Sequence, residues 1–292
     1  MKKFFLIFLT SLTFTSLHPD YIKFGHRLEK NIHIPGYRTF DYAFWLHPSQ
    51  GNRELENLFT KKTLDFYGAI IPEGSVAIDI GAHVGDTSVA YSLVVGDQGT
   101  VVAFEPNPSC FDVLKINAAN NKNIIPVNAA ITEENGNYTF YYTDPGLCNG
   151  AFAEMLSIHP YRIPVNVVGV NLENWLETQT PALISKVKFI KIDTEGYDRF
   201  IIKSIKNFLL KHRPILQTEL FTYLNNDEKI DLFTLIDSMN YKIVLAAYNG
   251  LIDTTSIASR KPFDLLSFIN FQVPEGSIDL LCIPDEQFSN YK

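Results

Sequence analysis

Two glycines and an acidic residue near the end of a predicted strand are spaced for ligand binding. The apolar run 75–80 contains Asp79, and Gly81, His83 and Gly85 follow just before a helical pattern. Glycine lets the backbone turn tightly and approach a ligand, and the first turn of a helix offers unpaired N–H groups. These residues predict a ligand-binding loop between a strand and a helix.

The side chains of this loop favour a cationic ligand over a pyrophosphate. A dinucleotide-binding loop has the pattern G-x-G-x-x-G, whereas His83 here replaces the middle glycine. Its bulk would block the phosphates, and the charge of Asp79 would repel them. S-adenosylmethionine has no phosphate and carries an ammonium and a sulfonium group, so we expect it as the cofactor. The alternatives are an NAD-dependent oxidoreductase and a binding protein without turnover.

A second acidic residue, Glu105, ends the apolar run 101–105 and lies 20 residues after Gly85. An acid at this point can accept hydrogen bonds from both hydroxyls of a ribose. The alternative is a plain strand-to-helix turn, in which Asp79 caps the helix and Glu105 is solvated. The residues predicted to bind the cofactor are Asp79, Gly81, His83, Gly85, Asp86, Glu105, Pro106, Asn107 and Asp193.

Candidate catalytic bases follow a later apolar run, 187–193. Methyl transfer to a hydroxyl needs the oxygen held in line with the methyl group, and often a base for its proton. Asp193 and Glu195 stand at the carboxyl end of this run, where ligands bind in open α/β sheets. Alternatively, Glu195 and Asp198 only place negative charge in the first turn of the next helix. His83 is a further candidate base, because imidazole has an ordinary pKa of about 6.5.

The elements that position these residues alternate along the chain. Short apolar runs separated by helical patterns are typical of βαβ units and a parallel sheet, so we predict an α/β fold. The predicted strands are 75–80, 101–105, 124–130, 187–193, 214–220, 241–246 and 277–283. The predicted helices are 85–95, 109–120, 171–178, 198–210 and 227–239.

Two regions depart from this alternation. Residues 137–170 form an insertion whose ends look like strands, and we expect its loop to cover the active site and select the substrate. Residues 1–17 carry two lysines and an apolar stretch, which fits either a secretory-type or membrane-associating segment or a first buried helix. Residues 18–69 are predicted to be an irregular N-terminal cap, and 70–292 the main domain.

Six segments resemble the FkbM-type methyltransferases, in the order and at the spacing of that family. They are AIDIGAHVGDTS (77–88), VVAFEPNP (101–108), VNAAIT (127–132), VNLENWL (170–176), VKFIKIDTEGYD (187–198) and RPILQTEL (213–220). One departure is His83, where the family usually has Asn. The resemblance implies a class I methyltransferase (Rossmann-like) sheet of about seven strands, with helices on both faces and the last strand antiparallel. It also implies S-adenosylmethionine as donor and, often, a hydroxyl of a sugar or secondary metabolite as acceptor.

The resemblance also implies that the fourth and fifth strands are neighbours. Asp193 and Glu219 would then converge beside the donor methyl, and we expect Asp193, Glu219 and His83 to carry the catalysis. We expect no metal, since two acids are few ligands, although Mg²⁺ often keeps several waters.

Composition excludes some partners. The chain of 292 residues has 25 Lys and Arg against 32 Asp and Glu, a formal charge of −7, which argues against a protein that tracks phosphate backbones. Three scattered cysteines show no zinc-site spacing. We expect a small-molecule or glycan acceptor, no nucleic acid, and membrane contact only through residues 4–17. Because the donor is made in the cytosol, we expect a cytoplasmic domain.

Overall fold

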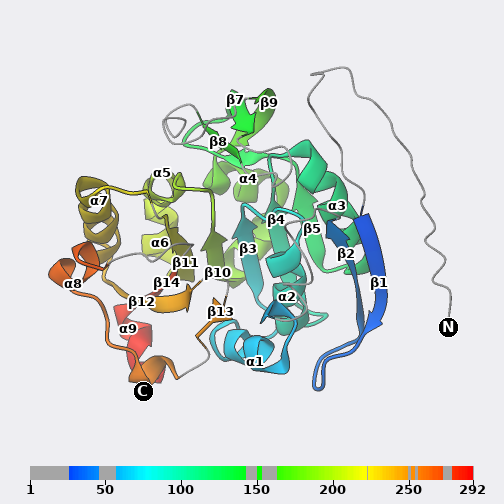
Figure 1. Cartoon of the computed structure of the whole chain (residues 1–292), viewed down its shortest axis with the longest axis horizontal. Helices are drawn as coiled ribbons and strands as arrows, with labels where there is room; N and C mark the ends of the chain where they lie inside the picture. Colours follow the sequence, from blue (N-terminus) through cyan, green and yellow to red (C-terminus); the bar gives the residue numbers. More distant parts are fainter. Residues whose placement is uncertain are drawn as a thin grey trace, which may run out of the picture.

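The core of the protein is a mixed β-sheet with eight strands in the described part of the chain (Figure 1). This computed structural model describes residues 26–45, 57–142, 150–152, 163–221, 223–248, 251–253, 256–271 and 278–291. The sheet order is β13-β12-β14-β11-β10-β3-β4-β5. The strands are β3 Val76–Ile80, β4 Thr100–Phe104, β5 Ile124–Val127, β10 Val187–Ile192, β11 Ile215–Leu220, β12 Tyr241–Tyr248, β13 Leu251–Ile252 and β14 Ile278–Pro284.

The strand directions confirm the predicted α/β sheet. The strands β5, β4, β3, β10 and β11 run parallel, whereas β14 pairs antiparallel with both β11 and β12. The last strand of the chain is therefore the antiparallel one, as expected. The two-residue β13 adds an eighth strand at the edge that the sequence did not predict.

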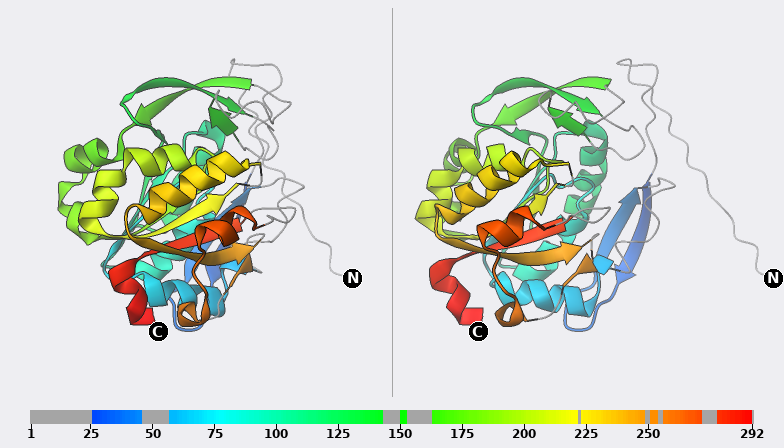
Figure 2. Two further views of the ribbon diagram at one scale, coloured as in Figure 1. Left: turned by 90° about the vertical axis from the view of Figure 1, so that its left-hand side faces the viewer. Right: turned by 60° about the vertical axis from the view of Figure 1, so that its left-hand side comes forward.

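Helices cover both faces of the sheet (Figures 1 and 2). Successive strand residues point to opposite faces, so Ile190 and Ile192 pack on one side and Phe189 on the other. The first side carries α4 Leu172–Gln179, α5 Asp198–Ser204, α6 Lys206–His212, α7 Asn226–Asp237 and α8 Leu265–Ile269. The second side carries α1 Lys61–Ile70, α2 Asp86–Val95 and α3 Pro108–Asn120. The chain also has α9 Asp285–Phe288 and short 3₁₀ turns at Pro181–Lys186, Ile257–Ser259 and Ser289–Tyr291.

Two predicted elements are divided in the structure. The predicted strand 124–130 was wrong in its second half, because β6, Ala130–Ile131, leaves the central sheet and pairs with β9. The predicted helix 198–210 is interrupted at Ile205, whose φ of −101° and ψ of 15° separate α5 from α6.

The insertion builds a second sheet, which Figure 2 shows as a separate layer at one end of the molecule. Its order is β6-β9-β7-β8, with β7 Gly136–Tyr142, β8 Gly150–Phe152 and β9 Ile163–Val170. The predicted strands at both ends of the insertion are confirmed. The loop expected to cover the site falls on residues 143–149 and 153–162, which lie outside the described residues, so its role stays a prediction.

The described part of the N-terminal region is regular, which corrects the expectation of irregular structure. Strands β1 His26–Ile32 and β2 Phe40–Trp45 form an antiparallel hairpin, and β2 lies against α3. The helix α1 begins after Thr60, whose side chain caps it. Tyr67 of α1 is fully buried, packs on Phe189 and donates a hydrogen bond to Gln217 of β11. The described residues 26–45 and 57–69 therefore share a hydrophobic core with the sheet, because their aromatic side chains need a surface to bury against.

The predicted hydrophobic segment 1–17 lies outside the described residues. Among the residues that are described, no helix is both long enough and apolar enough to cross a membrane.

Candidate functional site

The loop between β3 and α2, residues 81–85, requires glycine at both ends; we call it the glycine loop. Gly81 has a φ of 80° and Gly85 a φ of 90°. A Cβ at Gly81 would collide with the carbonyl oxygen of Asp193, and one at Gly85 would lie 2.7 Å from Leu114 Cδ1. The N–H groups of Gly81 and Ala82 both donate to the carbonyl of Phe104, at 3.0 and 2.9 Å. The loop is thus held between β4 and β10.

The carboxylate of Glu105 also binds the backbone of the glycine loop. Its carboxylate accepts the His83 N–H at 2.8 Å and the Asn107 N–H at 2.7 Å. The residue is only 6% exposed, so the alternative of a solvated Glu105 was wrong. Burial raises its pKa to about 7, against the two backbone hydrogen bonds that favour the carboxylate. After Pro106, Asn107 caps α3 by accepting from two N–H groups, those of Ser109 and Cys110.

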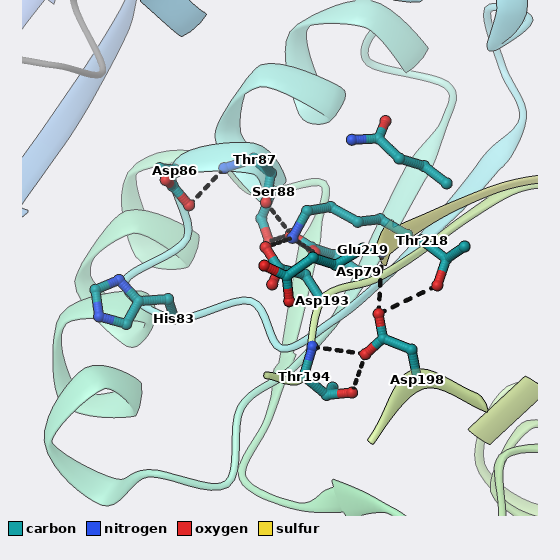
Figure 3. Close-up of polar contacts among 12 residues, drawn as sticks. Asp79, His83, Asp86, Thr87, Ser88, Asp193, Thr194, Asp198, Thr218 and Glu219 are labelled. Carbon is teal, nitrogen blue, oxygen red and sulfur yellow. Dashed lines mark hydrogen bonds and ion pairs between the residues drawn. The ribbon is translucent and has the colours of Figure 1, made fainter. Parts of the chain in front are cut away.

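Asp79 lies beneath the glycine loop rather than on it. It is fully buried, and its Oδ2 accepts hydrogen bonds from the hydroxyls of Thr87 and Ser88, at 2.7 and 2.6 Å (Figure 3). Asp86 opens the same helix and accepts from the Thr87 N–H at 2.8 Å. Asp79 therefore fixes the first turn of α2, close to the capping alternative considered from the sequence. Its contact with a cofactor stays a prediction.

Lys191 connects the two acids that the sequence singled out on neighbouring strands. Its Nζ lies 3.0 Å from Asp193 Oδ2 and 3.7 Å from Asp79 Oδ1, and the residue is buried. The flanking carboxylates raise its pKa well above the usual range, against the effect of burial. Sequence reasoning missed this lysine, although a charged residue inside the apolar run 187–193 was a visible signal.

Asp198 ties the loop after β10 to the end of β11. Its Oδ2 accepts from the N–H and the hydroxyl of Thr194, and its Oδ1 accepts from the Thr218 hydroxyl and the Glu219 N–H (Figure 3). Asp198 is the first residue of α5, as expected. Its carboxylate therefore binds Thr194 and the end of β11, in addition to placing negative charge at the start of the helix. Burial raises its pKa to about 7.

Five acids gather at this edge of the sheet; we call them the carboxyl cluster. They are Asp193, Glu195, Asp198, Glu219 and Asp279. Of these acids, Asp193 acts most strongly through its charge on Glu219, and Figure 3 draws both in the same part of the site. Burial, then the neighbouring carboxylates, raises the pKa of Glu219 well above its usual range. Burial and Asp193 likewise raise the pKa of Glu195 to about 8.

The structure brings together Asp193 and Glu219 but not His83. The His83 ring lies on the far side of the glycine loop from both carboxyl groups (Figure 3). His83 has a φ of 50°, so its backbone is adapted to the turn, and its role as a base stays a prediction. The sequence also missed Asp279, a single acid in the apolar run 277–283 that β14 places beside β11.

The residues described contain no group of three or more His, Cys, Asp or Glu arranged to hold a metal ion. Cys110 and Cys282 are free and buried, and Cys148 lies outside the described residues. Metal dependence stays a prediction.

Comparison with known families identifies the family of this chain. The sequence profile of the methyltransferase FkbM domain matches residues 79–243, which is more than half of the chain and contains the glycine loop, Glu105 and Asp193. The chain belongs to the FkbM methyltransferase family. This membership confirms the resemblance seen in the sequence and the expected methyl donor, S-adenosylmethionine. The fold is that of class I methyltransferases.

The following three solved structures resemble this chain only distantly in sequence. The FkbM methyltransferase from Methylobacillus flagellatus has 15% identity and a TM-score of 0.43, and the match covers 71% of this chain and 43% of that one. This chain thus spans less than half the length of that relative. A fibrillarin from Aeropyrum pernix, solved with S-adenosylmethionine, has 12% identity, a TM-score of 0.42 and 88% coverage of both chains. An S-adenosylmethionine-dependent O-methyltransferase from Thermotoga maritima has 10% identity and a TM-score of 0.40, covering 83% of this chain and 73% of that one. No curated protein matches.

The residues of this FkbM methyltransferase fit the donor. Gly81 lets the glycine loop lie against the backbone of Asp193, and at its other end Gly85 begins α2 without a side-chain cap, so the loop and the helix start can face a ligand through their backbone. Glu105 offers a buried carboxylate at the end of β4, the position that suits ribose hydroxyls. When bound, the donor supplies a methyl group on a cationic sulfur.

A buried asparagine connects the N-terminal hairpin to the glycine loop through hydrogen bonds. Asn117 of α3 accepts the Ala43 N–H at 2.7 Å and donates to the carbonyls of Ala43 and Val84, at 3.1 and 2.7 Å. We expect Asn117→Leu to weaken S-adenosylmethionine binding about tenfold, since it leaves the Val84 carbonyl of the loop and the Ala43 N–H of the hairpin unpaired, at a cost of about 1–3 kcal/mol. Calorimetric titration measures this.

Asn121 provides the matched control for that variant. It binds the same hairpin through Arg38 and the Asp41 carbonyl, whereas its side chain forms no hydrogen bond with the glycine loop in the described part of the chain. Asn121→Leu should lower the melting temperature while leaving donor affinity within about twofold, as expected for a site that does not touch the loop. Equal effects of both variants on donor affinity would show that the hairpin acts on stability alone.

Proposed function

We propose that this protein transfers the methyl group of S-adenosylmethionine to a hydroxyl oxygen on a sugar or a secondary-metabolite-like molecule. The observation that carries the proposal is the position of Asp193, which follows β10 and contacts Gly81 through its carbonyl side. Its side chain is 38% exposed, so an acceptor can reach it. Its Oδ2 forms an ion pair with the buried ammonium of Lys191.

The residues of the site would divide the work as follows. Asp193 accepts the proton of the acceptor hydroxyl as the oxygen forms its bond to the methyl carbon, a role typically worth 10²–10⁴-fold in rate. The positive charge on sulfur is lost when the carbon–sulfur bond breaks, so charge balances as the proton moves to the carboxylate. Lys191 keeps Asp193 in place through its ion pair. The carboxyl cluster also disfavours phosphate-bearing acceptors by repulsion, in keeping with a small-molecule or glycan acceptor. Because the donor is made in the cytosol, we place this reaction there.

Methyl transfer itself is tested by incubating the full chain with isotopically labelled donor and hydroxylated acceptors, and locating the label by mass spectrometry and NMR. Asp193→Asn should reduce turnover at least about 100-fold with little change in donor affinity. Chelation with EDTA should leave the rate unchanged. A rate lost on chelation and restored by Mg²⁺ would contradict the metal-free mechanism, and near-normal turnover of Asp193→Asn would remove Asp193 from it.

Donor binding is tested separately at Glu105. Glu105→Ala should weaken S-adenosylmethionine binding by about 1–3 kcal/mol, the cost of unpairing the ribose hydroxyls and the loop N–H groups. Calorimetry at pH 8, where the carboxylate is ionised, measures the loss. Exposed Glu177 on α4 serves as the control, and Glu177→Ala should bind the donor normally. Unchanged binding by Glu105→Ala would refute the ribose assignment.

A further inference from the structure

Two acids of the carboxyl cluster lie directly opposite each other on neighbouring strands. Glu219 near the end of β11 pairs in register with Asp279 near the start of the antiparallel β14. Side chains of directly opposed residues point to the same face of a sheet, and like charges in this arrangement destabilise the fold. Two opposed carboxylates at the carboxyl end of the parallel strands therefore need protons or a cation to compensate their negative charge.

The neighbouring residues compensate Asp279 in part, because Gln217 hydrogen-bonds its carboxyl group and the charge of Lys191 lowers its pKa, but they leave Glu219 uncompensated. Glu219 is only 7% exposed, and its Oε2 has no hydrogen-bond partner among the described residues. The ammonium of Lys191 forms its ion pairs with Asp193 and Asp79, and not with Glu219. The carboxylates that act most strongly on Glu219 all disfavour its charged form. A buried carboxylate in this position binds either a proton or a cation.

We propose that Glu219 and Asp279 form a subsite for a protonated amino group of the acceptor. This inference rests on the proposed function and narrows it, because the acceptor is then an amino sugar or an amino alcohol rather than a neutral or anionic molecule. An ammonium has three donors, so it can satisfy Glu219 Oε2 and share the charge of Asp279. Asp198 holds the backbone N–H of Glu219 and keeps this subsite adjacent to Asp193.

The first test compares two donor analogues by calorimetry and needs no acceptor. In sinefungin, a carbon atom that bears an amino group replaces the sulfonium sulfur and its methyl group. S-adenosylhomocysteine has a neutral thioether sulfur at this position. The wild-type protein should bind sinefungin about tenfold or more tightly than S-adenosylhomocysteine, because the ammonium faces the carboxyl cluster. Glu219→Gln and Asp279→Asn should each reduce that preference about threefold or more.

Two controls separate charge recognition from folding. Both variants should keep wild-type affinity for S-adenosylhomocysteine within about twofold, which shows that the donor site is intact. Glu177→Gln, on the exposed face of α4, should keep the full preference for sinefungin. If Glu219→Gln and Asp279→Asn retain the wild-type preference, the two carboxyls do not recognise a cation and the proposal is overturned.

The second test addresses the acceptor itself. Labelled donor is incubated with amino sugars and amino alcohols and, separately, with the same compounds after N-acetylation, which removes the charge and keeps every hydroxyl. Methylation of the free amines at least about tenfold faster than their N-acetylated forms supports the subsite. Equal rates, or no product from either set, overturn it. Failure of the proposed function is distinct, because then neither S-adenosylmethionine nor S-adenosylhomocysteine would bind in the calorimeter.

Discussion

Replacing Gly81 by alanine should abolish donor binding and destabilise the fold more than any other single methyl group added to the glycine loop. The alanine Cβ would collide with the backbone carbonyl of Asp193, and a backbone atom cannot rotate away as a side chain can. The left-handed conformation at a φ of 80° adds about 1–2 kcal/mol for any residue with a Cβ. We expect donor affinity to fall at least about 100-fold, measured by calorimetry.

A second glycine isolates the effect of the collision. Gly74 has a φ of 76°, close to that of Gly81, but a Cβ there would meet nothing within 4 Å. Gly74→Ala therefore carries the conformational strain alone and should lower stability by about 1 kcal/mol while binding the donor normally. If Gly81→Ala loses no more stability than Gly74→Ala and still binds the donor, the contact between the glycine loop and Asp193 is not structurally required.

Replacing Lys191 by methionine should cost about 3–5 kcal/mol of stability near pH 8, because the buried carboxylate of Asp79 loses its cation and the partly exposed Asp193 loses its ion pair. Methionine keeps the volume of the side chain, so the loss reports charge rather than packing. The exposed Lys188 on the same strand is the control. Lys188→Met should change the free energy of unfolding by less than about 0.5 kcal/mol. Urea unfolding measures both variants.

The cost of Lys191→Met should depend on pH with a definite sign. Burial raises the pKa of Asp79, and the pKa values of Asp198 and Asp279 rise to about 7. A carboxyl with a raised pKa binds more protons in the folded than in the unfolded protein, so stability falls as pH rises from about 4 toward the folded-state pKa. Wild type should thus be less stable at pH 8 than at pH 5.

Without the lysine, Asp79 and Asp279 should protonate at still higher pH, because the charge of Lys191 lowers the pKa of both. The difference between Lys191→Met and wild type should therefore shrink as pH falls from 8 to 5, where protons neutralise the acids that Lys191 neutralised before. A difference that stays constant across this range, or that matches Lys188→Met, would mean that Lys191 acts by packing and not by charge.

Much of the site could be predicted because its residues are close in sequence. The strand, the glycine loop and the first turn of α2 span Val76 to Thr87, so local rules on glycine, strand ends and helix starts predicted the loop. Glu105 was found in the same way, from its place at the end of the next apolar run. The apolar runs also predicted the central strands, since strands buried on both faces must be continuously apolar.

Only the tertiary structure decided which of the many acids act together. Asp193, Glu219 and Asp279 stand on β10, β11 and β14, and no local pattern tells that β14 inserts antiparallel between β11 and β12. That insertion sets Asp279 against Glu219 and gives the carboxyl cluster its charge. Likewise the aromatic N-terminal region looked irregular, yet the hairpin and α1 become ordered by burial against α3 and the sheet, and Asn117 connects them to the glycine loop. Side-chain chemistry and short spacings are written in the sequence, whereas contacts between distant strands depend on burial and register, which exist only once the sheet has formed.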